Sequence, residues 1–301
     1  MRVLGVAATV VLAAPATFLA WWHWPPDPSA ELLRRSVRFA GVARDSTTAK
    51  SAGLEHWRIA SADGDTFHAL WRPAPQGTEQ PWTVVMMGGL GTGQRAAAIL
   101  PAHVPTHVLA VDWPWHGPRR LSTFDAVRRL RAIREAVLRS PGVFALGVEA
   151  AAAQPEVSRE RIVVLGASLG APIIVAALRL TDVPAALVLV DGFADLGHVL
   201  EHALRREVRP PALASPLAAY AARLLHPVEP AHHMSHAASL PALVLNARDD
   251  ERIPIVAIDR LWAALPHAER RWRDGTHVRA HRSELIATLS DDVSAWLAGL
   301  D

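Results

Sequence analysis

The sequence lacks cysteine and has one lysine, Lys50, among its 301 residues. Without cysteine, the chain forms no disulfide bonds and offers neither a cysteine nucleophile nor thiolate ligands for a metal. Basic residues are almost all arginines, and they are mixed with acidic residues, so that the formal net charge is only +2. No basic stripe or polybasic block is present, which argues against a nucleic-acid-binding protein.

Residues 1–24 differ in composition from the rest of the chain. An apolar run of about 20 residues is long enough to span a hydrocarbon core of about 30 Å, and three tryptophans lie at or near its end (Trp21, Trp22 and Trp24). We predict a single N-terminal membrane anchor that leaves the remaining chain on the extracytoplasmic side. A cleaved signal peptide, with a secreted or periplasmic product, is the alternative, because residues 14–16 fit a cleavage site. A buried N-terminal helix is the third possibility.

The remaining chain divides into a linker with an amphipathic helix over 25–53 and one large domain over 54–301. Residues 56–61 and 66–71 alternate between polar and apolar side chains around the turn residues Asp63 and Gly64, which predicts a β-hairpin. Strand and helix patterns alternate after it. We therefore predict an α/β fold with a mostly parallel central sheet, helices on both faces and an antiparallel hairpin at its N-terminal end.

Two details of this domain are predicted from local signals. Ser122 and Asp125 form a capping box for a helix that continues to about Arg139, and the Pro141-Gly142 pair is expected to break it before a second helix over 143–153. Residues 195–239 form a connection of about 45 residues between two strands, which is far longer than usual. Because this connection contains two helical stretches, we predict a helical cap whose apolar side shapes a pocket.

The most informative motif is Gly166-Ala167-Ser168-Leu169-Gly170, which follows a short β-branched run and precedes an apolar, alanine-rich run. The pattern G-x-S-x-G between a strand and a helix is typical of a nucleophile elbow, a tight turn that exposes the serine hydroxyl. A serine that merely caps a helix is the alternative.

A serine hydroxyl needs a base within hydrogen-bond reach, and the base needs an acid that orients it. Two later loops supply such residues, since Asp249 and Asp250 follow the predicted strand 242–246, and His277 follows the strand 267–273. Asp191 and Asp195, which follow the strand 186–190, are less favoured candidates for the acid. Serine, aspartate and histidine occur here in the chain order of one particular hydrolase fold.

From about residue 54 to 298, the chain resembles the α/β-hydrolase superfamily, and its esterase, dienelactone-hydrolase and prolyl-oligopeptidase-like branches in particular. The resemblance rests on the following motifs: the Asp63-Gly64 hairpin, the glycine-rich segment 88–93, Asp112-x-x-x-His116-Gly117, the elbow, Asp250 four residues before Pro254, and Gly275-x-His277. It implies Ser168 as nucleophile, His277 as base and Asp250 as acid, with Asp249 as runner-up.

The resemblance also implies an oxyanion hole formed by the backbone N–H groups of Leu169 and Leu90. Gly88 stands where the family often has histidine, which leaves Gly89 as an alternative donor. Trp113 and Trp115 are candidates for the wall of an acyl pocket, although simple packing would also explain them.

These residues together predict a serine hydrolase that cleaves small or lipid-like carboxylic esters through an acyl-enzyme, without a metal or an organic cofactor. His233 and His236 lie one helical turn apart, but no carboxylate at matching spacing completes a metal site. A thioesterase, an acyltransferase or a peptidase would use the same triad. A non-catalytic, membrane-anchored binding protein is the alternative from another class.

Overall fold

A computed structural model describes residues 27–45, 53–89, 91–118 and 128–300. Its centre is a nine-stranded sheet with the spatial order β1-β2-β3-β5-β4-β6-β7-β8-β9. The strands are β1 (Phe39–Asp45), β2 (Glu55–Ser61), β3 (Thr66–Arg72), β4 (Trp82–Met87), β5 (Thr106–Val111), β6 (Ile162–Ala167), β7 (Ala186–Val190), β8 (Ala242–Ala247) and β9 (Glu269–Arg273). The first three strands and β5 pair antiparallel, whereas all pairs from β5 to β9 are parallel.

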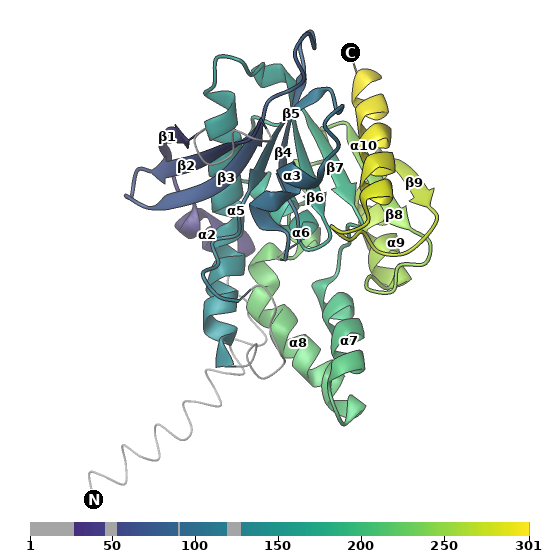
Figure 1. The fold of residues 1–301 in the computed structure, drawn as a ribbon. Helices are drawn as coiled ribbons and strands as arrows, with labels where there is room; N and C mark the ends of the chain where they lie inside the picture. The colour runs from purple at the N-terminus through teal and green to yellow at the C-terminus, as the bar shows by residue number, and fades with distance from the viewer. Residues whose placement is uncertain (1–26, 46–52, 90, 119–127, 301) are drawn as a thin grey trace, which may run out of the picture.

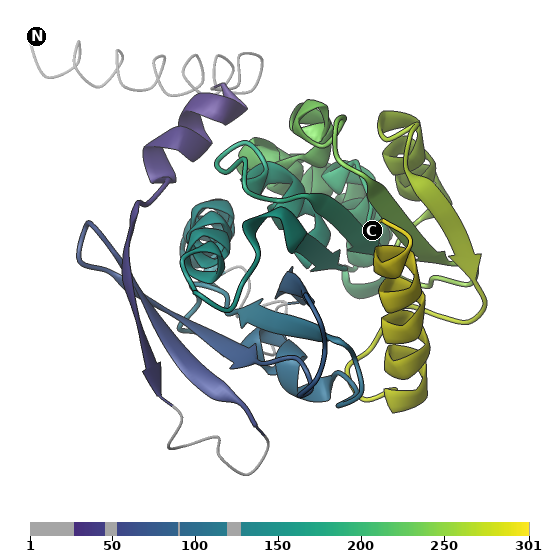
Figure 2. The ribbon, with the colours of Figure 1, turned by 90° about the horizontal axis from the view of Figure 1, so that it is seen from above.

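Helices cover both faces of this sheet (Figures 1 and 2). The α-helices are α2 (Pro28–Arg35), α3 (Ala96–Ile99), α5 (Leu130–Ala152), α6 (Gly170–Ala177), α7 (Leu196–Glu207), α8 (Ala214–Leu225), α9 (Ile255–Ala264) and α10 (Ser283–Ala298). One core cluster joins the sheet to α5, α6 and α9, and a second cluster joins the other face to α3 and α10. The parallel strands β4, β5, β7 and β8 are buried along their whole length, as strands covered on both faces must be. The predicted fold class is confirmed.

The segment 25–53 differs from its prediction as a linker with a helix. The helix is present as α2, but β1 then pairs along β2, so the sheet begins at Phe39 rather than near residue 54. β1 is an edge strand whose seven residues are at most half-buried. It therefore has no strong apolar alternation by which a sequence pattern would reveal it.

The predicted break at Pro141-Gly142 is also wrong, because α5 continues through both residues. A proline inside a helix removes one hydrogen bond, but the surrounding contacts hold the helix together here. Gly142 has a packing role, since a Cβ at this position would lie 2.9 Å from the carbonyl oxygen of Arg35. The glycine thus permits the end of α2 to approach α5 closely.

Residues 195–239 contain α7 and α8, which pack against each other and project beyond the sheet as a helical hairpin (Figure 1). Short 3-10 helices connect α8 to β8.

Several sequence predictions lie outside the described residues, namely those for residues 1–24, for Leu90 and for the capping box of Ser122 and Asp125. Within the described part of the chain, no helix has the length and apolar character needed to cross a membrane.

Candidate active site

Ser168 lies at the sharp turn between β6 and α6. Its φ angle of 55° is in the left-handed region, which a non-glycine residue adopts only under local constraint. The two glycines of the motif permit this turn. A Cβ on Gly170 would lie 1.9 Å from the carbonyl oxygen of Met87, and one on Gly166 would lie 2.7 Å from Cα of Ala171. The G-x-S-x-G pattern is therefore a requirement of close backbone packing between β4, β6 and α6.

His277 and Asp250 extend from Ser168 in one hydrogen-bonded chain. Nε2 of His277 lies 2.8 Å from the Ser168 hydroxyl oxygen, and Nδ1 lies 2.8 Å from Oδ2 of Asp250. The side chains of His277 and Asp250 are each only 1% exposed. The three residues that the sequence predicts as nucleophile, base and acid are thus brought together. A carboxylate on Nδ1 fixes the tautomer in which Nε2 can accept the proton of the serine.

The surroundings of Asp250 favour its ionised form. Burial raises the pKa of this carboxyl group, but the hydrogen bond and charge of His277 and the backbone N–H groups of Ile253 and Arg252 outweigh it and hold the pKa below its usual value. Those two N–H groups donate to Oδ1 at 2.9 Å and 2.8 Å, which leaves Oδ2 for the imidazole.

The two neighbouring candidates for the acid have other positions. The carboxylate of Asp195 caps α7 by accepting the N–H of His198, and it forms ion pairs with His198 and Arg260. Asp249 is exposed, and its backbone N–H donates to the carbonyl oxygen of Gly275.

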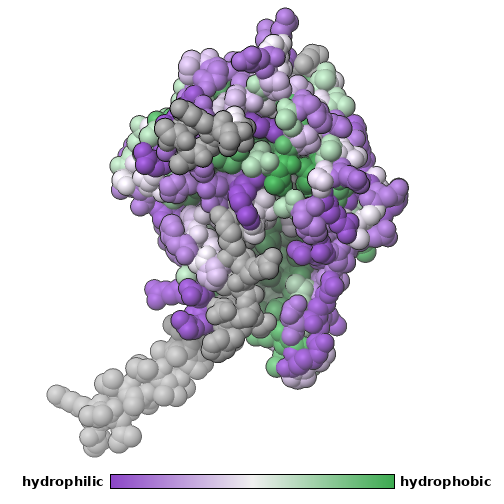
Figure 3. Space-filling model, in the orientation of Figure 1, coloured by the Kyte–Doolittle hydropathy of each residue, from purple (hydrophilic) through white to green (hydrophobic). Residues whose placement is uncertain are grey.

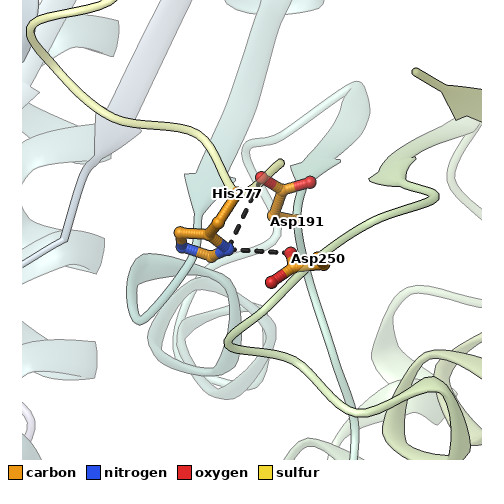
Figure 4. Close-up of side chains that lie close together, drawn as sticks. All are labelled: Asp191, Asp250 and His277. Carbon is orange, nitrogen blue, oxygen red and sulfur yellow. Dashed lines mark hydrogen bonds and ion pairs between the residues drawn. The ribbon is translucent and has the colours of Figure 1, made fainter. Parts of the chain in front are cut away.

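Asp191 is a second carboxylate beside the imidazole, and Figure 4 shows it on the opposite side of Nδ1 from Asp250. Its Oδ2 lies 3.6 Å from Nδ1 of His277 and accepts hydrogen bonds from Arg273 at 2.5 Å and from the Val278 N–H at 2.6 Å. Its Oδ1 accepts the Ala247 N–H at 3.1 Å. This fully buried side chain therefore joins the ends of β7, β8 and β9 to the loop that carries His277.

Burial raises the pKa of Asp191, whereas the Arg273 guanidinium and the Val278 N–H act in the opposite direction. Sequence reasoning weighed Asp191 only as an alternative acid and missed its contacts with this loop. Its position directly after a buried strand, at the same sheet edge as the predicted triad, is the signal that could have revealed them.

The loop after β4 faces the nucleophile. Gly88, Gly89 and Gly91 line the same cleft as Ser168 and Leu169. The indole N–H of Trp113 donates to the carbonyl oxygen of Gly88 at 2.9 Å, so Trp113 holds the beginning of this loop in place. Gly89 therefore remains a candidate oxyanion donor together with the Leu169 N–H, while Leu90 lies outside the described residues.

Trp113 and Trp115 do not form the wall of an acyl pocket, contrary to that reading of the sequence. They line a separate cavity with Phe67, Arg129 and Arg139, and Trp113 is buried in the core. Tryptophan at the end of a strand has the same pattern in both roles, and only its indole N–H, which needs a partner when buried, indicated the observed contact.

Two cavities meet at Ser168 and Leu169. One, of about 530 Å³, lies toward the glycine-rich loop and α10. The other, of about 400 Å³, lies against α7 and is lined by His202, Arg206 and Glu207 together with the loop after β8. Both volumes are in the usual range for small-molecule sites.

No separate metal centre is indicated by the described residues. The one group of three ligating side chains found among them is Asp191, Asp250 and His277, whose atoms already bond to one another and to Arg273. His233 donates or accepts at the Pro227 carbonyl, which as an acceptor requires the imidazole N–H, and its burial lowers its pKa to about 4. Arg179 donates to His236. These contacts explain both histidines without a metal.

Comparisons with known proteins were made once this geometry was in hand. The sequence profile described as "Alpha/beta hydrolase family" matches residues 84–300. No match was found among curated proteins.

Solved structures with the same fold include three of particular use. Acetyl xylan esterase 1 from Thermoanaerobacterium sp. JW/SL YS485 is 14% identical, with a TM-score of 0.61 over 91% of this chain and 94% of that one. An esterase of Pyrococcus furiosus is 17% identical, with a TM-score of 0.58 over 87% and 97%. A puromycin-hydrolyzing peptidase of Mycobacterium tuberculosis is 18% identical, with a TM-score of 0.60 over 82% of this chain but only 39% of the peptidase. At these identities, the likeness concerns the fold alone.

Proposed function

The chain belongs to the alpha/beta hydrolase family, and from this premise we propose that it is a serine hydrolase that cleaves carboxylic esters through an acyl-enzyme. The observation that carries the proposal is the pair of 2.8 Å contacts that join Ser168 to His277 and His277 to Asp250, at the bottom of an open cleft.

Each residue of this chain has a chemical task in the proposed reaction. The Ser168 oxygen attacks the carbonyl carbon of the ester, and Nε2 of His277 takes the hydroxyl proton and later delivers it to the departing alcohol. Asp250 stabilises the imidazolium that forms. The Leu169 N–H, with a second donor from the loop after β4, stabilises the oxyanion, and one such donor contributes about 3 kcal/mol to the transition state. Water then hydrolyses the acyl-enzyme by the same steps.

Esters are the first choice of substrate class because an alkoxide departs more readily than the nitrogen of an amide. Two of the esterases above match this chain over almost the whole length of both chains. The match to the puromycin-hydrolyzing peptidase spans less than half of that protein. Thioester cleavage, acyl transfer and peptide cleavage are the alternatives that the same triad would serve. A binding protein without catalysis is the alternative of another class.

The test is hydrolysis of p-nitrophenyl esters from acetate to palmitate by wild type and by Ser168→Ala. We expect turnover by wild type and a loss of at least 10³-fold in the variant, since removal of a triad nucleophile leaves only the oxyanion hole and binding. Ser158→Ala, a change at an exposed serine on the far side of β6, is the matched control and is expected to retain activity. A folded wild-type protein that is inactive on esters, thioesters and amides would instead support the binding protein.

We further propose that residues 1–24 attach the enzyme to a membrane, with the catalytic domain on the extracytoplasmic side. The protein should then remain in the membrane pellet after extraction with alkaline carbonate. Release into the supernatant with a shortened N-terminus would instead support a cleaved signal peptide.

A further inference from the structure

Two residues of the central strand β6 are less buried than their position predicts. β6 lies between β4 and β7, and helices cover both of its faces. Leu165 and Ala167 are nevertheless only half-buried, although Val163 on the same face is completely buried. A strand in the middle of a covered parallel sheet exposes side chains only where the packing above it is incomplete. The surface over Leu165 and Ala167 is therefore a cavity.

This cavity lies between the sheet and α10. It has a volume of about 80 Å³ and an almost entirely apolar lining that includes Val84, Leu165, Val190, Leu289 and Val293. Figure 3 shows hydrophobic residues at the surface between the positions of α3 and α10. The two serines of its lining, Ser290 and Ser294, direct their hydroxyl groups to carbonyl oxygens of their own helix at 2.7 Å. An apolar cavity of this kind holds water poorly and favours an apolar ligand.

The cavity is continuous in its lining with the cleft of Ser168. Five residues line both, namely Met86, Leu100, Ala167, Val278 and Ile286. Ala167 directly precedes the nucleophile, and Val278 directly follows His277. The strand register places Val84 beside Val163, four residues before Ala167, so the apolar path extends about 13 Å along the sheet from the level of the nucleophile.

The second cavity at Ser168 has the opposite character. Its wall on α7 and the loop after β8 carries five charged side chains (Arg206, Glu207, Glu251, Arg252 and Arg279). The two sides of the nucleophile therefore differ in polarity. The helical connection 195–239, which the sequence analysis expects to provide the apolar surface, contributes charged groups here instead.

We propose that the cavity beneath α10 is the subsite for an unbranched alkyl arm of the substrate, while the more polar part lies toward α7. The proposal rests on the proposed function and specifies its substrate class as esters with a medium-length alkyl arm, in the range of hexanoyl to decanoyl. Each methylene that enters the cavity contributes about fourfold to kcat/KM, since its burial follows the usual transfer free energy.

The alkyl arm could be the acyl chain or the alcohol, and two substrates distinguish them. Methyl octanoate carries the chain on the carbonyl side, and octyl acetate carries it on the oxygen side. Each is compared with methyl acetate, so that the ratio of kcat/KM values reports the chain alone. The arm whose ratio depends on the cavity is the arm that binds there.

Ser290→Leu is the variant that fills the cavity. Its side chain would occupy the space of two to three methylenes, so the octyl ratio should fall on the order of 15- to 60-fold. Thr288→Leu is the matched control, because Thr288 lies on the exposed side of α10 and bonds to its own helix in the same way. Val293→Ala enlarges the cavity and should shift the optimum toward longer chains, which tests the site even if Ser290→Leu does not fold.

A second measurement is independent of catalysis. In Ser168→Ala protein, sodium octanoate and 1-octanol should raise the melting temperature, and Ser290→Leu in the same background should abolish the increase. If no ester is cleaved but this stabilisation is observed, the alkyl site stands and the proposed function fails. If esters are cleaved while the octyl ratios and the melting temperatures are indifferent to folded Ser290→Leu and Val293→Ala, the alkyl site is refuted and the hydrolase stands.

Discussion

The two carboxylates beside His277 make a quantitative prediction about the replacement of Asp250 by asparagine. In Asp250→Asn, the amide that faces Nδ1 no longer provides a negative charge, and the imidazole loses its closest acceptor. Asp191, however, remains 3.6 Å from the same nitrogen. Because Coulomb attraction falls with the inverse of distance, Asp191 retains about three quarters of the attraction that Asp250 exerts at 2.8 Å, before Arg273 opposes it.

We therefore expect kcat to fall about 10²- to 10³-fold in Asp250→Asn. Loss of the acid in a serine triad without such a neighbour costs about 10⁴-fold, and we expect this larger loss only in the double variant Asp191→Asn/Asp250→Asn. Asp191→Asn alone should reduce kcat less than tenfold. Its larger effect should be on the melting temperature, since its Oδ2 atom accepts the buried hydrogen bonds of Arg273 and Val278.

The assay is a double-mutant cycle on kcat and kcat/KM with a p-nitrophenyl ester, with the melting temperature of each variant as the control for folding. The expected signature is non-additivity, in which Asp191→Asn does more harm when Asp250 is already absent. If Asp250→Asn is as inactive as the folded double variant, Asp191 does not support the imidazole and the reasoning is wrong.

Three further predictions follow from contacts around the site. Trp113→Phe keeps the packing but removes the N–H that holds the Gly88 carbonyl, so kcat should fall several-fold with little change in KM; an unchanged kcat would refute a role for this contact. Gly170→Ala would place a methyl group 1.9 Å from the Met87 carbonyl oxygen, and urea unfolding should reveal a loss above about 3 kcal/mol or failure to fold, whereas a stable, active protein would contradict the elbow geometry. Glu251 accepts hydrogen bonds from Arg279 and the His277 N–H, which outweigh the effect of its burial and lower its pKa from 4.5 to about 2. The stability that this carboxylate contributes is complete above pH 4.5 and is lost as pH falls toward 2, so Glu251→Gln should flatten the acid dependence of the melting temperature in that interval; an unchanged dependence would exclude Glu251 as its source.

The sequence predicts the features that depend on strong local patterns. The alternation of strands and helices, the Asp63-Gly64 hairpin and the elbow at Ser168 each leave a distinct signal, and the chain order of Ser168, Asp250 and His277 follows from the order of the loops. The family resemblance then favours Asp250 over Asp249, and the structure places Asp250 on Nδ1 of His277.

The features that the sequence did not predict depend on contacts between distant segments. β1 is a half-buried edge strand with a weak pattern, and Pro141 stays within α5 because surrounding packing overrides its local preference. Trp113 looks the same in sequence whether it lines a pocket or holds a carbonyl. The cavity beneath α10 is the difference between the volume enclosed by three strands and a helix and the volume of their side chains, which no local pattern encodes.

The position of α10 in the chain links substrate size to turnover in any attempt to engineer this protein. The loop that carries His277 continues after a few residues into α10, whose inner face closes the apolar cavity. Changes that shift the whole helix to admit larger substrates would therefore also move the imidazole away from Ser168. Selection for longer chains should succeed through individual side chains on the inner face of α10 and fail through displacement of its backbone.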